Sequence, residues 1–79
     1  MPNHWSIPPY DGPQTRRIRK LVEGNPERGD AAIRFAQYRS GMTVAEFIDA
    51  CDKLEVPNYA VYDLTWDSDP KRRLIEPYD

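Results

Sequence analysis

The segment from Met42 to Leu54 constrains the fold most, because it encodes an amphipathic helix together with its own start signal. Thr43 is a favourable N-cap, and Glu46 follows at the spacing of a capping box. Met42 and Phe47 stand where a hydrophobic staple would close. Apolar residues recur at i, i+3, i+4 and i+7, namely Val44, Phe47, Ile48 and Cys51. We expect a half-buried helix with an acidic outer face.

The length of 79 residues predicts one small domain with a modest hydrophobic core. The single cysteine, Cys51, excludes a disulfide within the chain. No basic segment precedes an apolar run, and no stretch approaches 18 apolar residues, so neither a signal peptide nor a membrane span is expected. These features indicate a cytoplasmic protein, either a monomer or a homodimer, that does not enter a membrane.

The first thirteen residues form a proline-rich segment, with prolines at positions 2, 8, 9 and 13. Proline excludes both a regular helix and a central strand here, so residues 1–13 are predicted to be an extended arm. Trp5, Ile7 and Tyr10 either pin the arm to the body or form a partner-binding patch. Residues 14–79 are predicted to form the single helical domain.

Two further helices are expected before the Thr43 helix. The first spans Gln14 to Gly24, with Ile18, Leu21 and Val22 on its buried side, and it stops at glycine followed by proline. The second spans Ala31 to Arg39, where small alanines permit close approach to a neighbouring helix.

The segment from Tyr59 to Asp67 is ambiguous. Alternating apolar positions with β-branched and aromatic residues slightly favour a strand. A helix that begins after Asn58 is the alternative. Residues 72–76 are predicted to form a short terminal strand, followed by a tail over 77–79. The predicted fold is therefore mainly α within the α+β class, with three to four short helices and a short C-terminal β element.

This layout resembles a winged helix-turn-helix, in which residues 58–68 would be the recognition helix and residues 73–76 the strand that leads into the wing. The stretches 25–28, 34–35, 38–47, 63–64 and 66–67 resemble a group of small uncharacterised proteins of phages and mobile elements. The resemblance covers about residues 18–76. That group has Lys where Glu27 stands and a Gly before the final strand, where this chain has residues 69–72. In size and charge alone, the chain is also similar to anti-CRISPR inhibitors.

Charge is unevenly distributed along the chain. Residues 1–41 carry seven basic and four acidic side chains, a net charge of +3, whereas residues 42–79 carry four and nine, a net charge of −5. Such asymmetry points to a macromolecular partner. The acidic half also contains aromatic residues, the type that anchors interfaces. The predicted protein-binding surface comprises Asp49, Asp52, Glu55, Tyr59, Tyr62, Asp63, Trp66, Asp67 and Asp69.

Binding of DNA is the alternative function. The candidate recognition segment offers carboxylates where base and phosphate contacts need Arg, Lys, Asn or Gln. DNA would therefore have to bind to basic residues elsewhere, which are Arg16, Arg17, Arg19, Lys20 and Arg28, with Lys71, Arg72 and Arg73 as a wing contact. Arg16 and Lys20, at i and i+4 of the predicted helix, would repel one another unless an anion bound them.

Catalytic and cofactor motifs are not found in the sequence. His4, the one histidine, lies in the proline-rich arm, and no glycine-rich phosphate loop is present. Residues 67–69 suggest a calcium loop, but the rest of the twelve-residue pattern is missing. We therefore expect a non-catalytic interaction protein without a metal or cofactor. The favoured form is an anti-CRISPR-type inhibitor that binds a nucleic-acid-handling protein complex, and the alternative is a winged-helix DNA-binding repressor.

Overall fold

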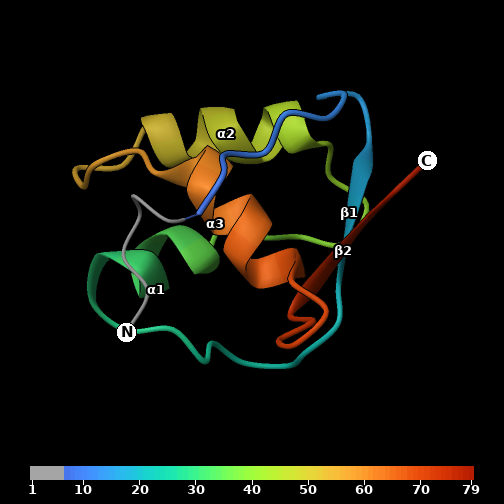
Figure 1. The fold of residues 1–79 in the computed structure, drawn as a ribbon. Coiled ribbons are helices and arrows are strands. Elements are labelled where there is room, and N and C mark those ends of the chain that lie inside the picture. Colours follow the sequence, from blue (N-terminus) through green and yellow to red (C-terminus); the bar gives the residue numbers. More distant parts are fainter. Residues whose placement is uncertain (1–6) are drawn as a thin grey trace.

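The computed structural model describes residues 7–79, which form three helices and a two-stranded antiparallel sheet (Figure 1). The two strands come from opposite ends of the described chain, and the helices lie between them in sequence. The elements are β1 (Arg17–Lys20), α1 (Gly29–Phe35), α2 (Val44–Asp52), α3 (Ala60–Ser68) and β2 (Ile75–Tyr78).

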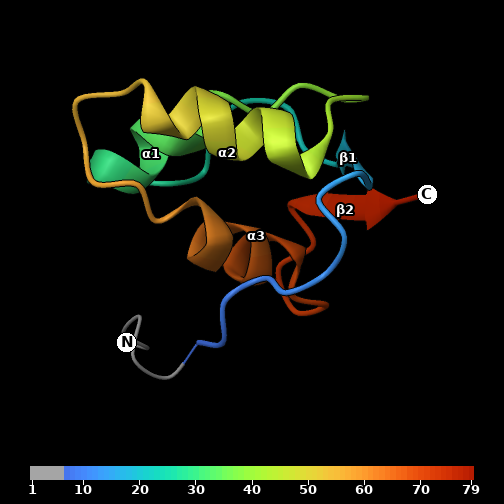
Figure 2. The same ribbon diagram turned by 90° about the horizontal axis from the view of Figure 1, so that it is seen from above.

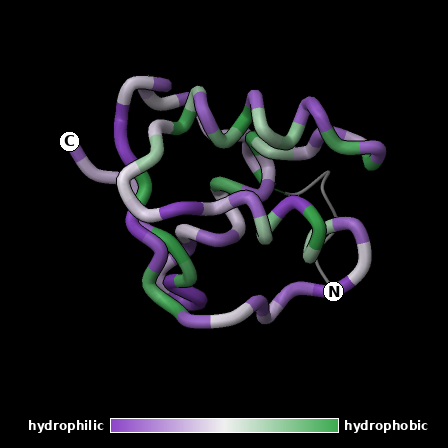
Figure 3. Tube along the Cα trace, turned by 180° about the vertical axis from the view of Figure 1, so that it is seen from behind, coloured by the Kyte–Doolittle hydropathy of each residue, from purple (hydrophilic) through white to green (hydrophobic). Residues whose placement is uncertain are grey.

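Helix α2 forms as the sequence predicts. The Thr43 hydroxyl accepts a hydrogen bond from the Glu46 N–H at 3.1 Å, and the Glu46 carboxylate accepts one from the Thr43 N–H at 2.7 Å. This reciprocal pair is the expected capping box. Figure 3 shows hydrophobic and hydrophilic residues alternating along the turns of α2. The hydrophobic residues face inward, since Val44, Phe47 and Cys51 are fully buried.

The predicted helix over residues 14–24 is wrong, because this segment contains strand β1. Only Ile18 is fully buried, whereas Leu21 is 37% exposed, so the apolar residues do not form a buried helical stripe. Long-range hydrogen bonds supply the reason. Ile18 N–H donates to the Met42 carbonyl at 2.7 Å, and Leu21 N–H donates to the Leu74 carbonyl at 2.9 Å. Hydrogen bonds to backbone groups on both sides of β1 stabilise a strand more than the local apolar pattern favours a helix.

The register of the strands gives the sheet one apolar face and one polar face. Ile18 lies opposite Pro77 and Arg19 lies opposite Glu76. Ile18 and Ile75 face the core, since their exposed fractions are 0% and 1%. Leu21 and Leu74 form a hydrogen-bonded pair. Hydrogen-bonded and non-hydrogen-bonded pairs alternate along an antiparallel sheet, so Ile18 and Pro77 are a non-hydrogen-bonded pair. The backbone nitrogen of Pro77 therefore faces the outer edge of β2. Proline has no N–H to offer there, which protects this edge against further strand pairing.

The predicted bounds of the C-terminal strand are also wrong. The strand begins at Ile75 and includes Pro77 and Tyr78, which the sequence assigned to a tail. Leu74 is only partly buried, whereas Ile75 belongs to the core.

The segment after Asn58 is helical, so the slight preference for a strand is wrong and the alternative is correct. The Asn58 side-chain oxygen accepts a hydrogen bond from Ala60 N–H at 3.1 Å, near the start of α3. Ala60 and Leu64, one turn apart, are both buried. Packing of this face against the core decides between two conformations that propensity leaves nearly equal.

Helix α1 is shorter than expected, because it ends at Phe35 instead of Arg39. The chain then turns, and Tyr38 enters the core with Phe35 and Phe47. The rings of Tyr38 and Phe47 stack with centroids 4.0 Å apart, and Phe35 meets Tyr38 edge-on at 5.0 Å. These aromatic contacts join α1 to α2.

The described part of the proline-rich arm, residues 7–13, lies against α3 (Figure 2). Tyr10 N–H donates to the Val61 carbonyl at 2.9 Å, and the Tyr10 hydroxyl donates to the Pro13 carbonyl at 2.8 Å. Tyr10 also packs on the core, as expected if the arm is pinned to the body of the protein. His4 and Trp5 lie outside the described residues. The fold is thus a small α+β arrangement, and its relationship to a winged helix stays a prediction.

Candidate functional site

The predicted acidic surface divides into an exposed part and a buried part. Asp49, Asp52 and Glu55, at the end of α2 and just beyond it, are exposed. Asp63 and Asp67 on α3 are buried, with exposed fractions of 9% and 2%. The prediction that these two carboxylates contribute to a surface is therefore wrong. Because α3 is a helix, positions 63 and 67 lie on the same side as the core residues Ala60 and Leu64.

Asp63 is buried because Arg34 of α1 neutralises it. The Arg34 Nε lies 2.5 Å from Asp63 Oδ2, and Arg34 Nη2 lies 3.3 Å from Oδ1. Arg34 itself is only 3% exposed, and its Nη1 donates to the Pro57 carbonyl at 3.0 Å. Burial acts to lower the pKa of Arg34, but the hydrogen bond and charge of Asp63 outweigh burial and raise it. This bidentate pair ties α1, α3 and the loop between α2 and α3 together.

Asp67 has a different environment. The Tyr38 hydroxyl donates to Asp67 Oδ2 at 2.8 Å, and among residues 7–79 no lysine or arginine forms an ion pair with Asp67. Burial raises the pKa of Asp67 to about 8, and the hydrogen bond and charge of Glu27 add to the rise, while the Tyr38 bond opposes it. Burial beside Asp67 also raises the pKa of Tyr38 well above its ordinary value. Burial thus favours the neutral form of the Asp67 carboxyl over its ionised form.

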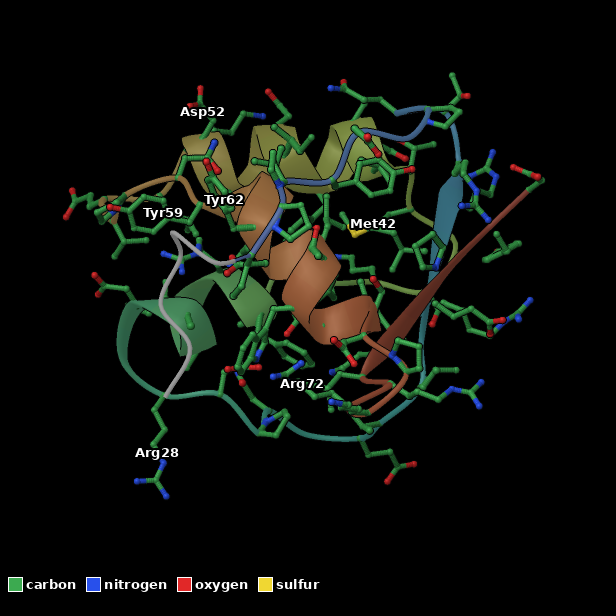
Figure 4. All side chains as sticks on the ribbon, viewed as in Figure 1. Arg28, Met42, Asp52, Tyr59, Tyr62 and Arg72 are labelled. Atoms are coloured by element: carbon green, nitrogen blue, oxygen red, sulfur yellow. The ribbon has the colours of Figure 1, made fainter. Side chains whose placement is uncertain are left out.

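Exposed carboxylates at and just beyond the end of α2 are followed along the chain by two tyrosines around the start of α3. We call Asp49, Asp52, Glu55, Tyr59 and Tyr62 the acidic–tyrosine patch. Figure 4 shows Asp52, Tyr59 and Tyr62 on the same side of the molecule. The tyrosine rings meet edge-on with centroids 6.5 Å apart, and Tyr59 is 40% exposed. The patch therefore combines negative charge, partly offset by the Lys53–Asp49 ion pair at 2.9 Å, with aromatic surface.

Trp66 and Asp69 lie in a separate cluster. The Arg72 guanidinium carbon lies 3.1 Å from the centroid of the Trp66 ring, and Arg72 Nη1 lies 3.4 Å from Asp69 Oδ2. This positively charged neighbour partly cancels the acidic character predicted for the end of α3.

Most of the predicted DNA-binding residues make contacts within the protein. Arg16 Nε pairs with Asp79 at 3.2 Å, and Arg16 Nη2 donates to the Pro77 carbonyl at 3.0 Å. Arg17 Nη1 donates to the Gly41 carbonyl at 2.6 Å. The predicted repulsion between Arg16 and Lys20 does not apply, because β1 is a strand and carries no helical i, i+4 pairs.

The other basic residues of β1 also make contacts within the protein. Arg19 pairs with Glu76 at 3.3 Å and lies 4.4 Å from the centroid of the Tyr78 ring. Lys20 Nζ lies 5.5 Å from the centroid of the Phe35 ring. Within residues 7–79, the predicted basic residues whose side chains form no hydrogen bond or ion pair and contact no ring are Arg28, Lys71 and Arg73, all exposed. Arg28 projects away from the body and lies well apart from Arg72 (Figure 4).

Cys51 and the acidic side chains are the remaining candidates for a reactive or metal-binding group among the described residues. Burial raises the pKa of the Cys51 thiol to about 12, which keeps it protonated and unreactive. No group of three or more His, Cys, Asp or Glu residues within 7–79 has an arrangement that could hold a metal ion.

Sequence reasoning missed the residues that hold the two buried aspartates. Arg34 and Tyr38 were not identified as functional or structural partners of α3. Arg34 and Asp63 are 29 residues apart, as are Tyr38 and Asp67. No local pattern in the sequence links these pairs, because Tyr38 lies beyond the end of α1 and each contact forms only when distant parts of the chain pack together.

Comparisons with known proteins do not extend these observations. No family model, curated protein or solved structure matches the chain. None of the helices in the described part of the chain has the length and hydrophobicity that crossing a bilayer requires.

Proposed function

We propose that this protein is a non-catalytic binding module that uses the acidic–tyrosine patch to contact a basic protein surface. The observation that carries the proposal is the combination of exposed carboxylates on α2 with Tyr59, which remains 40% exposed beside them. Aromatic residues supply contact area at low entropic cost, while carboxylates accelerate and orient association with a positive partner.

The buried ion pair supports the proposal, because it fixes the loop that carries part of the patch. Arg34 binds the Pro57 carbonyl, and its guanidinium carbon lies 5.2 Å from the centroid of the Tyr59 ring. Asn58 donates to the Ile48 carbonyl and to Asp52, both at 3.4 Å. A loop held in this way loses little conformational entropy when a partner binds.

Proteins that hold nucleic acid present basic grooves, and these grooves are the kind of partner that the patch complements. An inhibitor of the anti-CRISPR type, encoded by a phage or mobile element, is the narrower form of the proposal, and it rests on size and charge. DNA binding by a winged helix is the competing function, and most of the arginines it needs already contact carboxylates, carbonyls or rings.

A two-probe binding experiment tests the proposal. Fluorescence anisotropy would measure binding of the full chain to a labelled arginine-rich peptide and to a labelled duplex DNA, each at about 50 and about 200 mM salt. We expect the peptide to bind and the duplex not to bind. Changing Asp49, Asp52 and Glu55 together to Lys should weaken peptide binding by about tenfold or more.

A matched triple variant controls for net charge. Asp11, Glu23 and Asp30 are exposed and lie outside the patch, so changing them to Lys alters the net charge by the same amount. This variant should keep most of its peptide affinity. Equal losses in both triple variants would show that no specific patch exists. Salt-sensitive binding of the duplex, abolished by changing Arg17 and Arg19 to Glu, would favour the DNA-binding function instead.

A further inference from the structure

Tyr59 is an exposed residue whose ring packs on a buried one. It is 40% exposed and lies at the periphery of the molecule (Figure 4). Arg34, whose guanidinium carbon lies 5.2 Å from the centroid of the Tyr59 ring, is only 3% exposed. Arg34 therefore contacts the ring from the interior and is too deeply buried to touch a partner itself. A guanidinium is attracted to the face of a tyrosine ring, so this contact favours one orientation of the ring.

The backbone next to Tyr59 is held as well as its ring. The Tyr59 carbonyl accepts hydrogen bonds from Tyr62 N–H at 3.0 Å and from Asp63 N–H at 2.9 Å, in the first turn of α3. Two residues before Tyr59, the Pro57 carbonyl accepts a hydrogen bond from Arg34 Nη1 at 3.0 Å. Arg34 thus contacts both the loop that leads into α3 and the side chain at the N-cap of this helix.

Arg34 can act as a fixed support because Asp63 holds it in place. Arg34 Nε lies 2.5 Å from Asp63 Oδ2 and Arg34 Nη2 lies 3.3 Å from Oδ1, so two hydrogen bonds set the plane of the guanidinium. The Asp63 carboxylate also neutralises Arg34, which therefore does not repel a positively charged partner. Lysine would supply the same charge but has no planar group with several directed donors. The geometry therefore requires an arginine at position 34, and not merely a cation.

We propose that Arg34 is a positioning residue of the acidic–tyrosine patch, which increases the affinity for a basic partner by fixing the Tyr59 ring in its binding orientation. This inference rests on the proposed function, since it requires the patch to be the binding surface. An aromatic side chain that is already fixed loses less conformational entropy on binding than one that rotates freely. Loss of the Arg34 contacts should therefore weaken binding even where the fold survives.

Matched variants test this role with the labelled arginine-rich peptide and fluorescence anisotropy, after circular dichroism has shown that each variant is folded. Arg34→Lys keeps a positive charge beside Asp63. It loses the bond to the Pro57 carbonyl and the planar contact with Tyr59, so the Kd should rise by about tenfold. Tyr59→Leu should weaken binding to a similar degree, whereas Tyr59→Phe retains the ring and should bind like the natural chain. Thr43→Ala removes a cap at the opposite end of α2 from the patch and should leave the Kd unchanged.

A double-mutant cycle shows whether Arg34 acts through Tyr59. In the Tyr59→Leu background, Arg34→Lys should raise the Kd by about twofold or less, because the ring that Arg34 positions is already absent. A further rise equal to that seen in the natural chain would mean that the two residues act independently, and it would overturn the proposal.

A measurement on the natural chain decides the question even if Arg34→Lys does not fold. The Nε–H resonance of Arg34 would be followed by nuclear magnetic resonance while unlabelled peptide is added. This resonance should shift with the same midpoint as binding, because a partner on the Tyr59 ring alters the surroundings of the guanidinium packed against it. A natural chain that does not bind the peptide would overturn both the proposed function and the role of Arg34. Peptide binding with an unmoved Arg34 resonance, or with unchanged affinity in a folded Arg34→Lys variant, would overturn the role of Arg34 alone.

Discussion

Arg34 and Asp63 form a bidentate ion pair in the interior, with the Arg34 side chain 3% and the Asp63 side chain 12% exposed. Such a pair is costly to break, because removing one partner leaves the other charge buried. The pair connects two helices, and through Pro57 it also positions the loop beside the acidic–tyrosine patch.

Replacing Arg34 with Met should lower the free energy of unfolding by about 3–5 kcal/mol, because Asp63 would remain charged in a poorly solvated place. Urea unfolding followed by circular dichroism measures this change. Lys53→Met is the control, since the Lys53–Asp49 pair is 75% and 66% exposed and should contribute about 0.5 kcal/mol or less. Similar losses in the two variants would show that the Arg34 pair is not specially important.

The buried acid predicts that stability declines with increasing pH. Asp67 has a pKa of about 8 in the folded chain against an ordinary value of 3.8, so the folded state holds a proton that the unfolded state has lost. Its contribution is fully present below about pH 4 and is lost as the pH rises through about 8. Urea unfolding at several pH values should show this decline in the natural chain.

The Asp67→Asn variant should flatten that dependence, because it removes the titrating group. Comparison of the two chains isolates Asp67 from the other carboxyl groups, whose protonation at low pH acts equally on both. An identical pH dependence in both chains would show that Asp67 is ionised in the folded state at neutral pH.

Thr43→Ala should destabilise the protein by about 1 kcal/mol, because Glu46 N–H loses its capping oxygen. Thermal or urea unfolding measures the effect, and Thr15→Ala, an exposed change that caps no helix, should be close to neutral. The hydrogen bonds from Thr43 lower the pKa of Glu46 below its ordinary value of 4.5, so that part of the capping box is lost as the pH falls below that value. The cost of Thr43→Ala should accordingly be smaller at low pH, and an equal cost at neutral and acidic pH would argue against the reciprocal box.

Cys51 should resist alkylation in the folded protein. Burial raises its pKa from 9.0 to about 12, three units that correspond to a roughly 1000-fold smaller thiolate fraction. Reaction with iodoacetamide at about pH 8 should therefore be slower by about this factor than in a denaturant. Rapid modification without loss of structure would mean that the thiol is accessible.

Local sequence signals predicted the parts of the fold whose stabilising contacts are close in sequence. The capping box between Thr43 and Glu46 and the apolar stripe of α2 were both predicted correctly, because each depends on residues within two helical turns. The candidate surface was only partly predictable. The positions of Asp49 and Asp52 follow from the polar face of α2, whereas those of Asp63 and Asp67 depend on the conformation of α3.

The sequence by itself determined that this is a small α+β chain with a capped amphipathic helix and an uneven charge distribution. Only the tertiary structure decided that residues 17–20 form a strand, because their partners lie at Met42 and in residues 75–78. It also decided that Asp63 and Asp67 are buried, because Arg34 and Tyr38, each 29 residues away, satisfy them. Burial of a carboxyl group depends on long-range partners that offset its desolvation, and no local pattern encodes them.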